Sequence, residues 1–222
     1  MSSAQRFERF SSVFLLAGLG SLVVAFLVLG LAPASMVNKS ELNDVAASVP
    51  EDFQPYYKDA AAYRAGLLRG RDHYIAEACW HCHSQYVRPV SNEALRYGPV
   101  SQPGEYQNVL SRPQLFGTRR VGPDLSRESG KHTNDWHFAH LYNPKSVEPQ
   151  SVMPVYSWYF ELKKKDGSGL KPGENENSPD VVILPRQEAV DLVAYLQWLG
   201  NQVSSRSGTT YDPGAIVMPP RE

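Results

Sequence analysis

The longest apolar run of the chain lies near its N-terminus. Residues 10–32 carry no charge and consist mainly of Leu, Val and Phe, with interspersed glycines. Because a helix needs about 20 apolar residues to cross the hydrocarbon core of a membrane, this run predicts one transmembrane anchor helix. A cleaved signal peptide is the alternative, since residues 32–35 resemble a cleavage site. The apolar region of a signal peptide is shorter, about 7–15 residues, and the length therefore favours the anchor.

The charges beside this run predict its orientation. Arg6 and Arg9 precede it, whereas the following stretch carries four acidic residues up to Asp52 against Lys39 alone. Positive residues mark the cytoplasmic end of a membrane helix. We therefore expect residues 1–9 to face the cytoplasm and the rest of the chain to lie outside it.

Two helical patterns dominate the remaining chain. One apolar face recurs at steps of three and four residues from Tyr63 to Ala78 and leads directly into Cys79, and Gly70 on this face would let a second helix come close. The second pattern covers residues 185–200 and is the candidate partner of the first helix; it has a proline at its first position, a glycine at its last and a wide apolar face. No segment alternates apolar and polar residues over a sustained length, so we expect an all-α domain with long loops.

The distribution of polar residues predicts how the chain is divided. Residues 33–58 are polar with prolines and predict a linker, and residues 59–200 hold the helical patterns and the aromatic residues. Residues 201–222 are rich in Ser, Gly and Pro and predict a flexible C-terminal tail.

Composition and charge narrow the classes of function. The 222 residues are 42% hydrophobic and 20% charged, which is sufficient for a folded domain with a core. The formal net charge is −1, so the chain has no basic excess that would neutralise phosphates. We therefore expect no nucleic-acid partner.

The chain has two cysteines, and both belong to one motif. Cys79, Cys82 and His83 form C-x-x-C-H, the pattern of covalent c-type haem attachment. Two thiols about one helical turn apart can reach the two vinyl groups of one porphyrin, and the adjoining histidine can ligate the iron. The motif predicts one haem c, with His83 as the proximal iron ligand.

Other roles for this cysteine pair fit less well. A zinc site would need further cysteines or paired histidines, and a thioredoxin-like disulfide would need a βαβ setting that the helical pattern does not provide. A chance match is the third alternative. Outside the cytoplasm an unmodified pair of this kind would tend to oxidise.

Electron transfer requires a sixth iron ligand, and Met153 is the candidate. A methionine thioether opposite histidine raises the reduction potential of the iron. Of the four methionines, Met153 alone lies inside the predicted domain, beside Pro154; the others are Met1, Met36 and Met218. Bis-histidine ligation is the rival, with candidates His132, His137 and His140, which could equally be surface residues or hydrogen-bond partners.

A third motif brings a family resemblance. The sequence Gly122-Pro123-Asp124-Leu125 follows C-x-x-C-H by some forty residues and precedes a Met-Pro pair, an order that resembles class I cytochromes c. A proximal histidine usually donates its second ring N–H to an acceptor. The resemblance implies that the Pro123 carbonyl accepts this proton and that Leu125 packs on the haem.

The resemblance extends to one family of oxidase subunits. Five strings follow one another behind the anchor: GRDHYIAEACWHCHSQYVRP, LRYGPVSQPGEY, GTRRVGPDL, DWHFAHLYNP and VMPVYSW. They resemble the monohaem cytochrome c subunit of cbb3-type cytochrome c oxidases over roughly residues 5–160 and the last helix.

The resemblance implies a single-pass subunit of the bacterial inner membrane with its haem domain on the periplasmic side. Its partners would be a dihaem cytochrome c subunit, which donates electrons, and the catalytic haem-copper subunit, whose low-spin haem b accepts them for reduction of oxygen to water. Oxygen reduction and proton translocation would occur in the complex, so that this chain acts as an electron carrier without its own substrate chemistry.

The sequence departs from this family in two places. Tyr86 stands where a methionine is expected, and residues 163–180 form an added loop before the last helix. Arg88, Arg96 and Arg120 are candidates to pair with haem propionates, because guanidinium groups bind carboxylates bidentately. Solvated surface arginines are the equal alternative.

Three other functions remain as alternatives. The cytochrome c subunit of a nitric oxide reductase has the same anchor and one haem, but HSQ with RP and HLYNP favours the oxidase. A haem-based gas sensor or peroxidase-like enzyme would need an open sixth position. A non-haem adhesive or assembly subunit would show no visible absorbance.

Overall fold

The structure is a computed structural model. It describes residues 3–36, 46–117, 119–171, 174–175 and 178–200, so the predicted tail 201–222 and residues 37–45 of the predicted linker lie outside the described residues. The chain divides into two compact units, Met1–Lys39 and Ser40–Glu222.

The first unit is one apolar helix with a local change of hydrogen bonding. It comprises α1 (Ser3–Ala25), a π-helical turn (Phe26–Leu31) and α2 (Ala32–Ser35). In the π-helical turn the Ala32 N–H donates to the Leu27 carbonyl, next to Pro33, which has no N–H to donate. Its large apolar side chains are exposed within the unit. The stretch Phe10–Ser35 is long and apolar enough to cross a membrane, close to the predicted range of 10–32.

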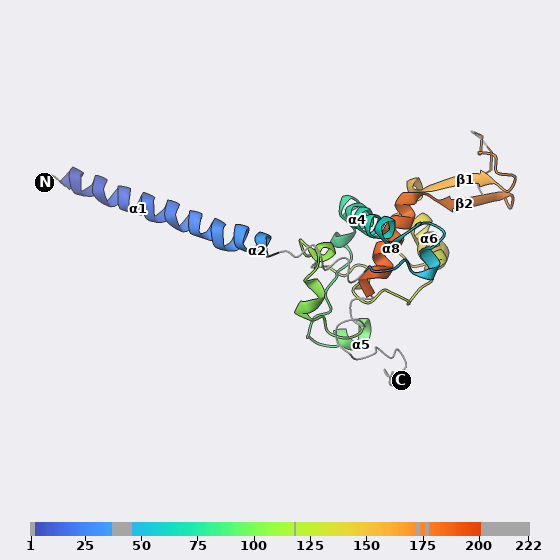
Figure 1. Cartoon of the computed structure of the whole chain (residues 1–222), viewed down its shortest axis with the longest axis horizontal. Coiled ribbons are helices and arrows are strands. Elements are labelled where there is room, and N and C mark those ends of the chain that lie inside the picture. Colours follow the sequence, from blue (N-terminus) through green and yellow to red (C-terminus); the bar gives the residue numbers. More distant parts are fainter. Residues whose placement is uncertain (1–2, 37–45, 118, 172–173, 176–177, 201–222) are drawn as a thin grey trace. The chain divides into compact units, whose positions relative to one another are not determined.

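The core of the second unit forms where α4 (Ala60–Ala76) packs on α8 (Gln187–Gly200) (Figure 1). The carboxylate of Asp59 caps α4 by accepting the Ala62 N–H at 2.7 Å. Gly70 permits the close approach, since a Cβ at this position would lie 2.9 Å from Cβ of Tyr195. The structure thus confirms the predicted pairing of these two helices, and the buried core follows the predicted faces.

The helix before the cysteines ends earlier than its apolar pattern predicts. It ends at Ala76, and Ala78 has a left-handed conformation with φ 55°. A separate 3-10 turn, Cys79–His81, then begins. The prediction that the helix leads directly into Cys79 is therefore wrong, because a left-handed residue redirects the chain one position before the motif.

Short helices and 3-10 turns, joined by long loops, make up the rest of the described part of the domain apart from one hairpin. They are 3-10 turns Glu51–Phe53, Pro103–Tyr106, Val109–Ser111 and Ser157–Tyr159, and helices α5 (Glu93–Tyr97), α6 (Asn134–Tyr142) and α7 (Pro144–Val147). The Thr133 hydroxyl caps α6 by accepting the Trp136 N–H at 3.2 Å. Most of the regular secondary structure of the domain is helical and long loops connect the helices, as predicted.

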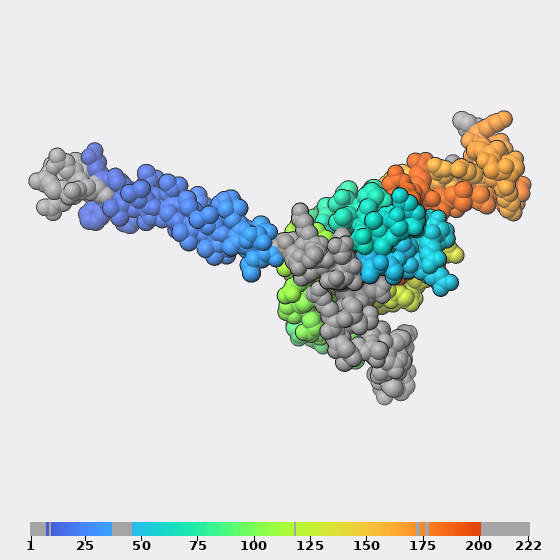
Figure 2. Space-filling view, in the orientation of Figure 1, coloured from blue at the N-terminus to red at the C-terminus, as the bar shows by residue number. Residues whose placement is uncertain are grey.

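One feature departs from an all-α domain. Strand β1 (Phe160–Lys164) pairs antiparallel with β2 (Val181–Pro185), with Phe160 opposite Pro185 and Lys164 opposite Val181. The hairpin projects from the helices in Figure 1, and its residues protrude from the surface in Figure 2. It frames the predicted loop 163–180. Pro185 ends the second strand and α8 begins at Gln187, so the expectation of Pro185 as the first helical residue is wrong.

The domain also begins earlier than predicted. Ala46, Phe53 and Tyr57 belong to the buried hydrophobic core, although all three lie in the predicted linker 33–58. The linker was predicted from the polar composition of this stretch, and a few isolated apolar residues do not change that composition. The segment 46–58 is therefore part of the domain.

Candidate haem-attachment site

The two cysteines and His83 lie on one tight turn. The N–H groups of Cys82 and His83 both donate to the Cys79 carbonyl, at 3.1 and 2.9 Å. Both cysteines are free; Cys79 is half-buried and Cys82 is exposed. Burial raises the pKa of the Cys79 thiol to about 12, so this thiol is protonated at neutral pH. The turn thus presents two thiols and an imidazole within five residues.

The His83 ring is held by the backbone of a distant segment. Its Nδ1 lies 2.9 Å from the carbonyl oxygen of Pro123, forty residues further along the chain. A carbonyl can only accept, so Nδ1 carries the proton and the lone pair of Nε2 is left for a ligand bond. Burial lowers the pKa of His83, whereas the Pro123 carbonyl raises it; the net shift is downward, which favours the neutral ring.

Two glycines provide the space in which this histidine lies. A Cβ at Gly122 would meet the ring itself, at 2.8 Å from both ring nitrogens. At Gly117, φ is +66° and a Cβ would lie 2.6 Å from the His83 carbonyl oxygen. Any side chain at either position would displace His83 or its backbone.

Backbone hydrogen bonds join the motif to the Gly122–Leu125 segment. The Gly122 N–H donates to the Cys82 carbonyl at 3.0 Å, and the Leu125 N–H donates to the Ser84 carbonyl at 2.8 Å. The two segments run parallel at Ser84 and Asp124. The predicted neighbours Pro123 and Leu125 are thereby brought to the motif, and Leu125 is buried in the core.

Asp124 is a functional candidate that the sequence did not reveal. Its side chain is 0% exposed. One carboxylate oxygen accepts the Ser84 hydroxyl at 2.6 Å and the Tyr86 N–H at 2.9 Å, and the other accepts the Ser126 N–H at 2.9 Å. Asp124 stands between Pro123 and Leu125 in the sequence. The family resemblance implied roles for these two neighbours and none for Asp124.

The arginines predicted for haem propionates have protein partners. Arg88 donates through Nε to Glu93 at 2.7 Å, Arg120 forms an ion pair with the same carboxylate, and Arg96 lies over the ring of Tyr97. Burial raises the pKa of Glu93, but hydrogen bonds from Arg88 and Arg120 outweigh it and bring the pKa to about 2. A propionate role for these arginines stays a prediction.

Met153 packs against the hydrophobic core of the domain. It is half-buried and contacts the same hydrophobic core as Cys79 and Trp80. Met36 is 80% exposed in the first unit, and Met218 lies outside the described residues. The choice of Met153 as the sixth ligand stays a prediction.

The three rival histidines gather around α6. The ring of Trp136 is stacked between His132 and His140, with ring centroids 3.7 and 4.6 Å away. His137 is buried, with Nε2 3.8 Å from the Glu128 carboxylate, and burial lowers its pKa to about 4. These contacts give the three histidines packing roles in the domain.

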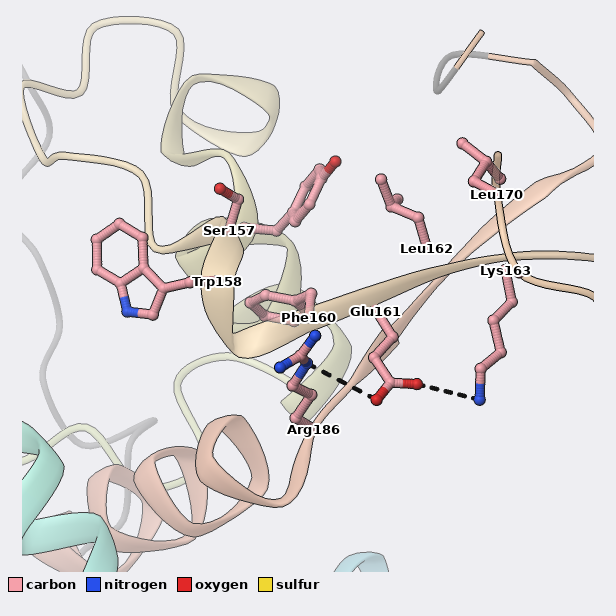
Figure 3. A pocket seen from close by; sticks show the side chains of 10 residues that line it. Ser157, Trp158, Phe160, Glu161, Leu162, Lys163, Leu170 and Arg186 are labelled. Atoms are coloured by element: carbon pink, nitrogen blue, oxygen red, sulfur yellow. Dashed lines mark ion pairs between the residues drawn. The ribbon is translucent and has the colours of Figure 1, made fainter. Parts of the chain in front are cut away.

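A surface pocket at the base of the hairpin lies apart from the motif. It has a volume of about 620 Å³ and is lined by ten residues, Trp158, Phe160, Leu162 and Leu170 among them. In Figure 3, Glu161 forms ion pairs with Lys163, at 3.1 Å, and with Arg186, at 3.8 Å. None of the predicted haem-binding residues lines this pocket.

The residues brought together fit a covalently bound haem. Two free thiols share a turn with an imidazole whose Nδ1 is already held, and Gly122 leaves the ring room that any larger residue would occupy. Cys79, Cys82 and His83 would hold the group, with Met153 as the candidate for the opposite side of the iron.

A comparison with protein families identifies the chain. The family described as cytochrome c oxidase, mono-heme subunit/FixO matches residues 26–172, which is more than half of the chain and includes both cysteines, His83, Pro123 and Met153. No curated protein matches the sequence. The chain therefore belongs to the FixO family of monohaem subunits of cytochrome c oxidase.

Proposed function

We propose that this chain is a one-electron relay within a cbb3-type oxidase. It accepts an electron from the dihaem cytochrome c subunit and delivers it to the low-spin haem b of the catalytic subunit, where oxygen is reduced to water. The observation that carries the proposal is the contact of His83 Nδ1 with the Pro123 carbonyl, which prepares Nε2 as an iron ligand. Family membership supports the oxidase as the complex.

The residues of the site have distinct tasks in this relay. Cys79 and Cys82 would hold the haem covalently, and His83 and Met153 would supply the iron ligands. When bound, haem c supplies a reversible Fe(III)/Fe(II) couple, so one electron is gained and lost without breaking a bond. Ligation by Met153 would keep small ligands away from the iron.

The N-terminal helix serves as the membrane anchor in this proposal. Its stretch Phe10–Ser35 has the length and composition of a spanning helix. Arg6 and Arg9 place residues 1–9 in the cytoplasm by the positive-inside rule. The domain then lies on the periplasmic side of the bacterial inner membrane. In that oxidising compartment an unmodified cysteine pair would tend to form a disulfide, whereas attachment to haem would protect both thiols.

A reduced-minus-oxidised spectrum of the membrane-extracted chain tests the proposal. We expect a low-spin c-type spectrum that Met153→Ala converts to a high-spin or ligand-binding form. Met36→Ala is the matched control, since Met36 is exposed in the first unit, and it should leave the spectrum unchanged. A spectrum unaffected by Met153→Ala contradicts methionine ligation.

Two further results would favour the alternatives. Ready binding of carbon monoxide by the reduced wild-type chain would indicate an open sixth position and hence a sensor or peroxidase-like role. A purified complex that reduces nitric oxide but not oxygen would indicate a nitric oxide reductase subunit.

A further inference from the structure

A buried ionic cluster adjoins the His83–Pro123 contact. We call it the Arg120 cluster: Ser84, Glu93, Arg120 and Asp124. The Arg120 Nε donates to the Ser84 hydroxyl at 2.6 Å, and that hydroxyl donates to Asp124 at 2.6 Å. The Arg120 side chain also forms ion pairs with Glu93 and Asp124 and donates to the Tyr86 carbonyl at 2.6 Å.

The cluster is costly for a domain of this size. The side chains of Arg120, Glu93 and Asp124 are 11%, 10% and 0% exposed. Buried charges are tolerated only when they are paired and hydrogen-bonded, and apolar replacements are often as stable. Stability alone therefore explains such a cluster poorly, and its position suggests a role in the site.

Each end of the cluster is one residue away from the contact that orients the proximal histidine. Ser84 follows His83, and Asp124 follows Pro123. The Ser84–Asp124 hydrogen bond therefore spans the same gap between the two segments as the His83–Pro123 contact, and Arg120 fixes both of its partners. A shift of either segment would change the distance between Nδ1 and the Pro123 oxygen.

We infer that Ser84, Asp124 and Arg120 are positioning residues that set the strength of the His83–Pro123 hydrogen bond and, through it, the reduction potential of the haem. The inference rests on the proposed function, since it needs His83 as the iron ligand. A strong acceptor at Nδ1 makes the imidazole more basic, which stabilises Fe(III) and lowers the potential. Loosening the cluster should therefore raise the potential.

The charges of the cluster allow positioning to be separated from a direct electrostatic effect. Removal of the Arg120 charge by Arg120→Gln would lower the potential if only the field mattered, because a nearby positive charge favours the reduced iron. Positioning predicts the opposite sign. Ser84→Ala changes no charge and should shift the potential only if position matters.

Redox titration of the detergent-solubilised full chain provides the test, with its visible spectrum recorded first. We expect Ser84→Ala and Arg120→Gln both to shift the potential to more positive values while the low-spin spectrum is retained. Asp191→Asn is the matched control: Asp191 is also a buried carboxylate and accepts hydrogen bonds from Tyr57 and Arg69, but it does not contact the motif. It should leave the potential unchanged even where it lowers stability.

The possible results separate this inference from the proposed function. An unshifted potential in Ser84→Ala, a negative shift in Arg120→Gln, or an equal positive shift in Asp191→Asn would each overturn the inference and leave the relay intact. A wild-type chain without covalent haem would overturn both. Should Arg120→Gln not accumulate, Ser84→Ala decides alone, since it removes a single oxygen atom.

Discussion

Gly70 of α4 lies against the backbone of Asp191 in α8, so closely that a Cβ at position 70 would lie only 2.5 Å from the Asp191 carbonyl carbon. The carbonyl oxygen is closer still. A side chain here would meet a backbone group that cannot rotate away. The approach of the two main helices therefore depends on the absence of a side chain at position 70.

Gly70→Ala should destabilise the domain. Overpacking a close contact costs about 1–3 kcal/mol of unfolding free energy. Backbone atoms cannot move away as a side chain can, so we expect a loss at the upper end of that range. Urea unfolding followed by tryptophan fluorescence measures it. Gly104→Ala is the control, because a Cβ there meets nothing within 4 Å. Equal stability of the Gly70 variant and the wild type would show that the helices can separate without cost.

Tyr57→Phe tests the hydrogen bond that ties the segment 46–58 to α8. The Tyr57 hydroxyl donates to Asp191 at 2.7 Å, and its ring covers Gly66, where a Cβ would lie 2.7 Å from the hydroxyl oxygen. A hydrogen bond to a charged group contributes about 1.5–3 kcal/mol, and we expect a loss of this size. The neighbouring Tyr56→Phe alters an exposed ring and should change little. Similar unfolding midpoints for both variants would show that the hydrogen bond from Tyr57 to Asp191 contributes little to the stability of the domain.

Gly122→Ala should disturb the proposed site more than the fold. The added methyl group would occupy the place of the His83 ring, 2.8 Å from each nitrogen, so the ring must turn away from Pro123. We expect reduced covalent haem content or loss of the low-spin spectrum, measured by haem staining and absorbance. Gly169→Ala, at a position with open space, should retain both. A normal spectrum in the Gly122 variant would count against His83 as the proximal ligand.

Glu128 should make stability depend on pH near neutrality. Burial raises the pKa of its carboxyl group from 4.5 to about 7, although Lys131 lowers it. The folded chain then keeps a proton that the unfolded chain releases, so the stabilisation is complete below about pH 4.5 and is lost as the pH rises through about 7. The facing groups are Lys131 and His132, both 4.0 Å away, His137 at 3.8 Å, and Asp124, whose charge also raises the pKa.

Glu128→Gln should remove the loss of stability that accompanies a rise in pH. Between pH 5 and pH 8 the wild type should lose about 2 kcal/mol more unfolding free energy than the variant. The difference between the two proteins isolates Glu128 from His137, whose lowered pKa of about 4 gives a slope of the opposite sign. Parallel pH profiles for wild type and variant would show that Glu128 titrates normally.

Local spacing made much of the site predictable. C-x-x-C-H defines chemistry within five residues, and the resemblance to class I cytochromes c named Pro123, whose carbonyl the structure places 2.9 Å from His83 Nδ1. The close approach of a second helix at Gly70 was also predictable, since a glycine on the apolar face of a helix lets a neighbouring helix come near. The family match confirms the family that the combined motifs indicated.

The remaining features depend on contacts that no local pattern contains. Asp124, Glu93 and Arg120 are ordinary charged residues in the sequence and acquire their role only when distant segments meet. The strand Val181–Pro185 had a local signal in its β-branched residues, but a two-stranded hairpin is too short to show sustained alternation. Ala78 gave no signal, because alanine seldom adopts a left-handed conformation.

The forty residues that separate His83 from Pro123 also have a kinetic consequence. The two cysteines are three positions apart, so their common turn can form early and locally, whereas the orientation of the imidazole must wait until a loop of forty residues has closed. In the proposed relay, covalent attachment of the haem would therefore need only the sequence near the motif, whereas ligation by an oriented His83 would need the folded domain.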